Sequence, residues 1–158
     1  MKNAFLLFVL LWFSSGINAH GFDYSVIVLT EKENNTWNLH LTSSLDAFRK
    51  EVKIHFADTP YTTPEEFNEQ LLKHIGSTLQ IKVEGKSISL GDGKVTLGHE
   101  TSIAFKKIHV PNTAKTVHLI NGAVKDIYRH TTRLFVHRLG KGKKSYTLNK
   151  ANGFTAKI

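Results

Sequence analysis

Apolar and polar residues alternate along most of this chain, with the period of two that is typical of β-strands. Two such runs, Phe22–Thr30 and Thr36–Ser44, are separated by a short charged segment that ends in two asparagines. In the second run Trp37, Leu39 and Leu41 share one face, and polar side chains occupy the other. Two alternating runs joined by so short a polar loop predict an antiparallel hairpin.

The second half of the chain continues this pattern in short segments separated by Gly, Asn and Pro. We expect further strands over residues 79–84, 86–90, 95–97, 103–110, 117–119, 132–139, 144–148 and 154–158. Within 103–110 the apolar positions change parity near Lys106 and Lys107, where a β-bulge would keep the inward side chains on one face. Residues 123–131 are expected to form an irregular connection that places Ile127 and Tyr128 on the core.

One segment carries a clear helical signature. Thr63, Pro64 and Glu66 form a capping box with proline at the first helical position, and Gly76 is suited to end the helix. Leu45–Phe56 is ambiguous, because apolar residues repeat at helical spacing in its first half and alternate in its second half. For Leu45–Phe56 we favour a helical turn that leads into a short strand.

This order of elements predicts a mainly β protein. This series of short strands, with one short capped helix, indicates an antiparallel β-sandwich of immunoglobulin-like type. Because no repeat or linker interrupts the pattern, residues 20–158 are expected to form a single domain.

Residues 1–19 have a different character. A basic start at Lys2, the apolar run Ala4–Phe13 and small residues up to Ala19 are typical of a secretory signal peptide, and the run is shorter than the ~20 residues of a membrane span. We favour cleavage after Ala19 over cleavage after Gly16. The protein is therefore expected to be exported, to the periplasm or as a secreted protein, with no transmembrane segment after cleavage.

Charge suggests one kind of partner. The formal net charge is +8, and there is no cysteine that could carry a lipid anchor or a disulfide. Seven cations concentrate around the last predicted hairpin: Arg129, Arg133, Arg138, Lys141, Lys143, Lys144 and Lys150. This cluster predicts an anion-binding patch for an acidic envelope glycan or lipid headgroups, or else a solvated face that protects an edge strand. An envelope protein is another possible partner, whereas nucleic acid is not expected for an exported protein.

The nine histidines suggest a metal site. If His20 begins the mature chain, its α-amine and imidazole can chelate one ion together, and nitrogen ligands suit Cu(II). His109, His118 and His137 are candidates for a further ligand, since they lie on predicted strands. The arrangement resembles the amino-terminal histidine site of copper monooxygenases and of some periplasmic copper carriers.

No catalytic motif stands out. The chain lacks a Gly-x-Ser-x-Gly elbow, a glycine-rich phosphate loop and the His-x-x-x-His spacing of helical metal sites. We therefore expect a non-enzymatic binding or accessory protein of the cell envelope without a cofactor. A periplasmic copper-binding protein is the alternative, and a hydrolase of unrecognised type is a second alternative.

Several motifs, taken in order, resemble one family. They are the Ala-His junction at residues 19–20, the Glu-rich helix that leads to His74, the segment 79–86, the segment 95–100 and the closing hairpin with Ser145 and Leu148. The family consists of small exported bacterial proteins catalogued only as a domain of unknown function. The resemblance implies an exported β-rich domain and implies no activity.

Overall fold

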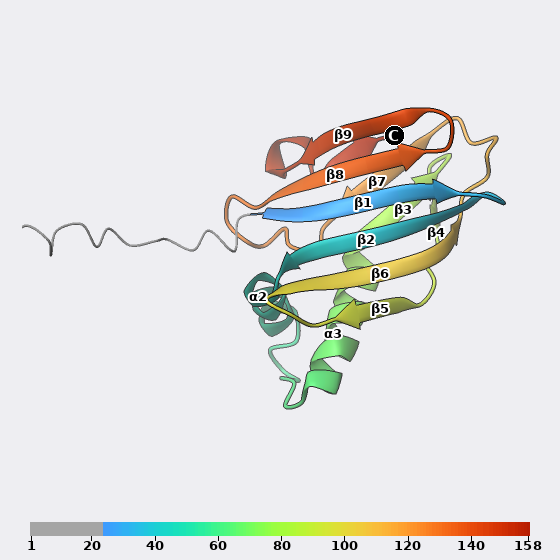
Figure 1. Cartoon of the computed structure of the whole chain (residues 1–158). Coiled ribbons are helices and arrows are strands. Elements are labelled where there is room, and N and C mark those ends of the chain that lie inside the picture. The colour runs from blue at the N-terminus through green and yellow to red at the C-terminus, as the bar shows by residue number, and fades with distance from the viewer. Residues whose placement is uncertain (1–23) are drawn as a thin grey trace, which may run out of the picture.

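The strands of this protein form two sheets that share one hydrophobic core (Figure 1). The structure is a computed structural model that describes residues 24–158, so the predicted signal peptide and His20 lie outside the described residues. The larger sheet has six strands in the order β5-β6-β2-β1-β8-β9. Their bounds are β1 Tyr24–Lys32, β2 Thr36–Ser44, β5 Gly93–Thr96, β6 Glu100–His109, β8 Thr131–Arg138 and β9 Gly142–Leu148.

The smaller sheet has four strands in the order β10-β7-β3-β4. Its strands and the remaining elements are β3 Leu79–Val83, β4 Lys86–Ile88, β7 Val117–Asn121, β10 Thr155–Lys157, the helices α2 Leu45–His55 and α3 Pro64–Thr78, and the short 3-10 helix η2 Lys150–Asn152. Within residues 24–158 there is no helix with the length and apolar character needed to cross a membrane.

The alternation seen in the sequence places one face of each sheet in the core. Leu39, Ile103 and Leu134 of the larger sheet and Ile81 and Leu119 of the smaller sheet are fully buried in a single cluster. Each such side chain contributes about 2 kcal/mol of hydrophobic stabilisation. The predicted mainly β fold built from two sheets is therefore confirmed.

The larger sheet is not purely antiparallel. β1 pairs with β2 in antiparallel register, as the predicted hairpin requires, but its other neighbour β8 runs parallel to it. The chain between β1 and β8 contains both helices and most of the smaller sheet (Figure 1). The mixed sheet thus departs from the antiparallel pairing that we expected.

Leu45–His55 is one continuous helix, so the expected turn into a strand is wrong. The side chain of Ser44 caps the helix by accepting a hydrogen bond from the Ala47 amide at 3.1 Å. Phe48 and Val52 are buried, whereas Ile54 is 48% exposed. The residues at helical spacing are therefore the buried ones, and their burial favours a helix over the expected strand. The alternation of apolar residues over 52–56 does not correspond to a buried face.

The one helix that we predicted, α3, begins with the expected capping box, in which the Glu66 amide donates to Thr63 Oγ1 at 3.2 Å. It continues past Gly76 to Thr78 and leads directly into β3, so the expected end at Gly76 is wrong. The predicted bulge in β6 is present, since Lys107 has a φ of 58° and Phe105 and Ile108 are both buried.

Candidate metal centre

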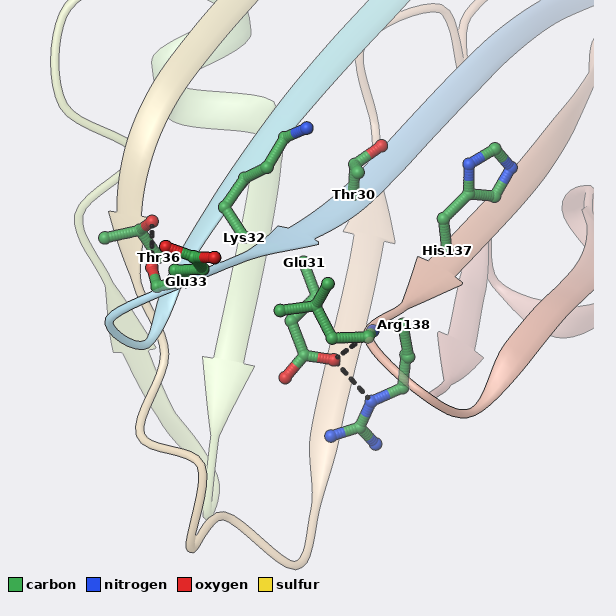
Figure 2. A pocket seen from close by; sticks show the side chains of 8 residues that line it. Thr30, Glu31, Lys32, Glu33, Thr36, His137 and Arg138 are labelled. Carbon is green, nitrogen blue, oxygen red and sulfur yellow. Dashed lines mark hydrogen bonds and ion pairs between the residues drawn. The ribbon is translucent and has the colours of Figure 1, made fainter.

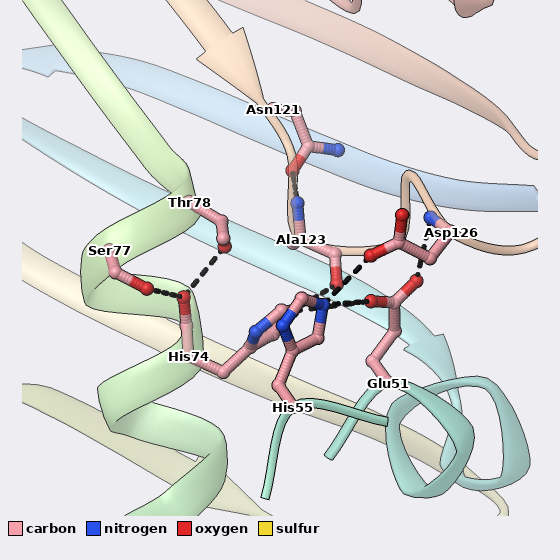
Figure 3. A network of polar contacts seen from close by, with 8 residues as sticks. All are labelled: Glu51, His55, His74, Ser77, Thr78, Asn121, Ala123 and Asp126. Carbon is pink, nitrogen blue, oxygen red and sulfur yellow. Dashed lines mark hydrogen bonds and ion pairs between the residues drawn. The ribbon is translucent and has the colours of Figure 1, made fainter. Parts of the chain in front are cut away.

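Two helices and one loop bring four polar side chains together beside the larger sheet (Figure 3). Glu51 and His55 are one turn apart on α2 and therefore lie on the same side of that helix. His74 lies on α3, one turn before α3 leads into β3. Asp126 belongs to the loop between β7 and β8.

Glu51, His55 and His74 each direct a ligand atom to the same point. His55 Nε2 and His74 Nε2 both lie 3.5 Å from Glu51 Oε2, and the two ring centroids are 4.6 Å apart. In the part of the chain that the structure describes, these three residues form the group of metal-ligating side chains whose donor atoms all lie within 4.8 Å of one another.

The loop that follows β7 closes over this group through three contacts. The Asp126 amide donates to Glu51 Oε1 at 3.0 Å, and Asp126 Oδ2 lies 2.8 Å from His55 Nε2. His74 Nε2 lies 2.9 Å from the carbonyl oxygen of Ala123 and donates to it when that nitrogen is protonated. In this loop Ile127 is buried as expected, but Tyr128 is 77% exposed, so its predicted packing on the core is wrong.

Glu51 is the most unusual member of the group, because its carboxylate is fully buried and one of its oxygens lacks a hydrogen bond. Oε1 is satisfied by the Asp126 amide, whereas the buried Oε2 accepts no hydrogen bond and lies 3.5 Å from each of the two imidazole nitrogens. A buried, charged oxygen without a hydrogen bond costs several kcal/mol. It is stabilised either by a proton or by a cation.

Burial shifts the pKa values of Glu51 and His74 in opposite directions. Burial raises the pKa of Glu51 to about 7, although the hydrogen bond from the Asp126 amide opposes this shift. Burial lowers the pKa of His74, and its contact with the Ala123 carbonyl opposes that shift. Near neutral pH, His74 is therefore an uncharged imidazole, and Glu51 is partly protonated.

Two imidazole nitrogens and a carboxylate oxygen are a common ligand set for Zn²⁺. In a tetrahedral site with bonds of about 2.0–2.1 Å, neighbouring ligand atoms are roughly 3.3 Å apart, and the two distances from Glu51 Oε2 to the imidazole nitrogens are 3.5 Å. Asp126 Oδ2 contacts His55 Nε2 at 2.8 Å but is not among the donor atoms that lie within 4.8 Å of one another, so its carboxylate would have to shift to serve as a fourth ligand. An ion bound to His74 Nε2 would replace its contact with the Ala123 carbonyl, so the ion and the loop compete for this nitrogen.

The histidines predicted as copper ligands do not take part in this centre. His118 alternates with buried Val117 and Leu119 and so lies on the outer face of the smaller sheet. His137 lies on the outer face of the larger sheet, beside Thr30 (Figure 2), and His109 is exposed at the end of β6. Since His118 and His137 lie on opposite outer faces, they do not share a site, and the contribution of His20 lies outside the described residues.

The seven cations predicted as an anion-binding patch are distributed over several surfaces. Arg133 is exposed on the outer face of β8, whereas Lys144 pairs with buried Val136 and so lies towards the inner side. Arg138 Nε donates to Glu31 Oε2 at 3.3 Å at one end of a groove of about 550 Å³ (Figure 2), and its guanidinium carbon lies 5.6 Å from the ring centroid of buried Trp37. Arg138 is therefore partly neutralised, and the seven cations do not share one face.

The sequence patterns do not predict the Glu51 centre, because they favour a short strand where the protein has a helix. A strand over residues 52–56 would separate Glu51 from His55, whereas a helix places residues i and i+4 on one face. The Glu-x-x-x-His spacing at residues 51–55 was the available signal. The approach of His74 and Asp126 depends on tertiary packing and leaves no local pattern.

No protein-family model matches this chain, and no curated protein was found to match it. The resemblance to a family of exported bacterial proteins therefore stays a prediction.

Proposed function

We propose that this protein is an exported, non-enzymatic binding protein for a divalent transition-metal ion of the zinc class. Glu51, His55 and His74 are the proposed ligands, and Asp126 is the proposed fourth ligand. The predicted signal peptide supports export. The observation that carries the proposal is Glu51 Oε2, which is buried without a hydrogen bond at 3.5 Å from each of two imidazole nitrogens.

A purely structural role for this cluster accounts for the geometry less well. A core that needs only packing gains nothing from a buried carboxylate whose pKa is raised to about 7. A divalent ion would neutralise the charge of Glu51 and would also bind the lone pair of the neutral His74 imidazole. Metal binding therefore explains why a glutamate and a histidine are buried together.

Binding without catalysis is supported by the position of Asp126. A catalytic zinc keeps one coordination position open for water or substrate, whereas here the Asp126 carboxylate, 2.8 Å from His55 Nε2, is the proposed ligand that moves in to fill that position. The side chains of His55 and Asp126 are 35% and 36% exposed, so the ion has a route to solvent on this side. This combination suits a protein that binds the ion and releases it again, such as a metal carrier or a metal buffer.

The proposal is tested by titrating the protein with Zn²⁺ and, separately, Cu²⁺ in competition with a chromophoric chelator. One ion per chain is expected, with Cu²⁺ bound more tightly than Zn²⁺, as for most nitrogen and oxygen sites. Glu51→Gln and His55→Gln should each weaken Zn²⁺ binding by about 100-fold, whereas the matched surface variant His118→Gln should not change it. Unchanged affinity in Glu51→Gln and His55→Gln would overturn the proposal.

The same titration separates this centre from the alternative copper site at His20. Removal of His20 should leave Zn²⁺ binding intact if Glu51, His55 and His74 are the ligands. If metal binding depends on His20 and is unaffected by Glu51→Gln, the amino-terminal site is the metal site.

A further inference from the structure

A second concave site lies on the opposite side of α2 from Glu51 and His55. This groove has a volume of about 550 Å³ and runs between α2, the segment that follows it and Gln70 of α3. Grooves of roughly 300–1,000 Å³ are of the size that holds small organic ligands. The metal centre does not use any of the residues that line the groove.

The floor of the groove is apolar. Val52, Phe56, Pro60 and Tyr61 line it, and the Tyr61 ring packs edge-to-face on buried Phe67 with the ring centroids 5.0 Å apart. The Gln70 amide nitrogen donates to the Thr59 carbonyl oxygen at 2.6 Å, which attaches the outer wall to α3. The apolar floor is thus held by contacts to α3 and is already formed without a ligand.

The rim of the groove is basic. Arg49, Lys50 and Lys53 line it from α2, and no carboxylate is among the lining residues. Arg49 lies 3.7 Å from Asp46, whereas Lys50 and Lys53 make no ion pair with any residue in the range 24–158. Two cations without partners at the mouth of an apolar groove are complementary to a ligand with an anionic head and an apolar body.

We infer that this groove binds a single-chain anionic amphiphile of the fatty-carboxylate class. The carboxylate lies at Lys50 and Lys53, and the hydrocarbon chain lies along Val52, Phe56 and Tyr61. This inference is independent of the proposed metal function, because the two sites use opposite sides of α2.

The test uses dodecanoate below its micelle concentration, measured by displacement of a dansyl-labelled fatty acid in the presence of a metal chelator. Saturable binding of one molecule per chain is expected. The double variant Lys50→Gln/Lys53→Gln should bind dodecanoate about tenfold more weakly, with little change in the affinity for uncharged dodecanol. Phe56→Ala should weaken both ligands.

A matched control removes the same charge elsewhere. Lys86→Gln/Lys94→Gln changes two exposed lysines outside the groove and should leave dodecanoate affinity unchanged. Equal weakening in both double variants would mean that net charge alone attracts the ligand and would overturn the inference. Binding only to vesicles that contain phosphatidylglycerol, with no binding of monomeric dodecanoate, would also overturn it. Glu51→Gln should leave dodecanoate binding intact, so a failure of the metal proposal can be distinguished from a failure of the groove proposal.

Discussion

The backbone amide of Asp126 donates a hydrogen bond to Glu51 Oε1 over 3.0 Å, and Glu51 Oε2 is left without one. This hydrogen bond fixes the orientation of the Glu51 carboxylate, with Oε2 3.5 Å from Nε2 of both His55 and His74 (Figure 3). Because the donor is a backbone group, substitution of the Asp126 side chain leaves this bond in place. The orientation of Glu51 and the charge around it can therefore be tested separately.

Glu51→Gln should stabilise the metal-free protein at pH 8 while it weakens zinc binding. Burial raises the pKa of Glu51 from 4.5 to about 7, and a shift of that size corresponds to at most about 3 kcal/mol of destabilisation by the ionised form. Glutamine keeps the shape and the acceptor for the Asp126 amide. Urea denaturation at pH 8 with a chelator measures the effect, and a destabilised variant would contradict it.

The pH dependence of stability should have a defined sign. A carboxyl whose pKa is raised on folding contributes fully below the unfolded value of 4.5, and its contribution is lost as the pH rises through about 7. As the pH rises from 4.5 to 8, the unfolding free energy of Glu51→Gln should therefore increase relative to that of the wild type. His74 acts in the opposite sense, because its lowered pKa removes stability as the pH falls below 6.5. A difference that does not vary with pH would show that Glu51 has no raised pKa.

Zinc binding should release protons. With a pKa of about 7, Glu51 is half protonated at pH 7, so binding should displace about half a proton from it. Affinity should increase as the pH rises through 7 and level off above it. Calorimetric titrations at pH 7 in buffers with different ionisation enthalpies measure the number of protons, and the Glu51→Gln variant should lack this contribution.

Asp126→Asn should weaken zinc binding by about tenfold and leave stability nearly unchanged. The variant removes the carboxylate beside His55 but keeps the backbone donor to Glu51. An exposed acid, Asp92, provides the control, since Asp92→Asn makes the same change in charge away from the centre. If both variants weaken binding to the same extent, Asp126 acts through general electrostatics and is not a ligand.

Two glycines should respond to alanine in opposite ways. A Cβ on Gly93 would lie 2.6 Å from Leu72 Cδ2 and 2.8 Å from Phe105 Cε1, so Gly93→Ala should force these two side chains to move and cost about 1–3 kcal/mol. Gly76 is exposed within α3 and a Cβ there meets no atom within 4 Å, so Gly76→Ala should stabilise the helix by up to about 1 kcal/mol. Chemical denaturation of the two variants tests both effects.

The sequence predicts the parts of this fold that depend on local patterns. Alternation identifies β1 and β2, and the capping box at Thr63 identifies the start of α3, because each depends on neighbouring residues alone. The parallel pairing of β1 with β8 brings together strands about a hundred residues apart, and no local signal specifies it. The metal centre depends on the same kind of long-range packing, since His74 and Asp126 reach Glu51 from separate elements.

The central claim is tested most directly by a crystal structure of the protein grown with zinc, with diffraction data collected at the zinc absorption edge. We expect one anomalous peak about 2.0–2.2 Å from His55 Nε2, His74 Nε2 and a carboxylate oxygen of Glu51, with His74 Nε2 no longer 2.9 Å from the Ala123 carbonyl oxygen. No peak at this position, with the contact between His74 and Ala123 intact in crystals that contain zinc, would contradict the account.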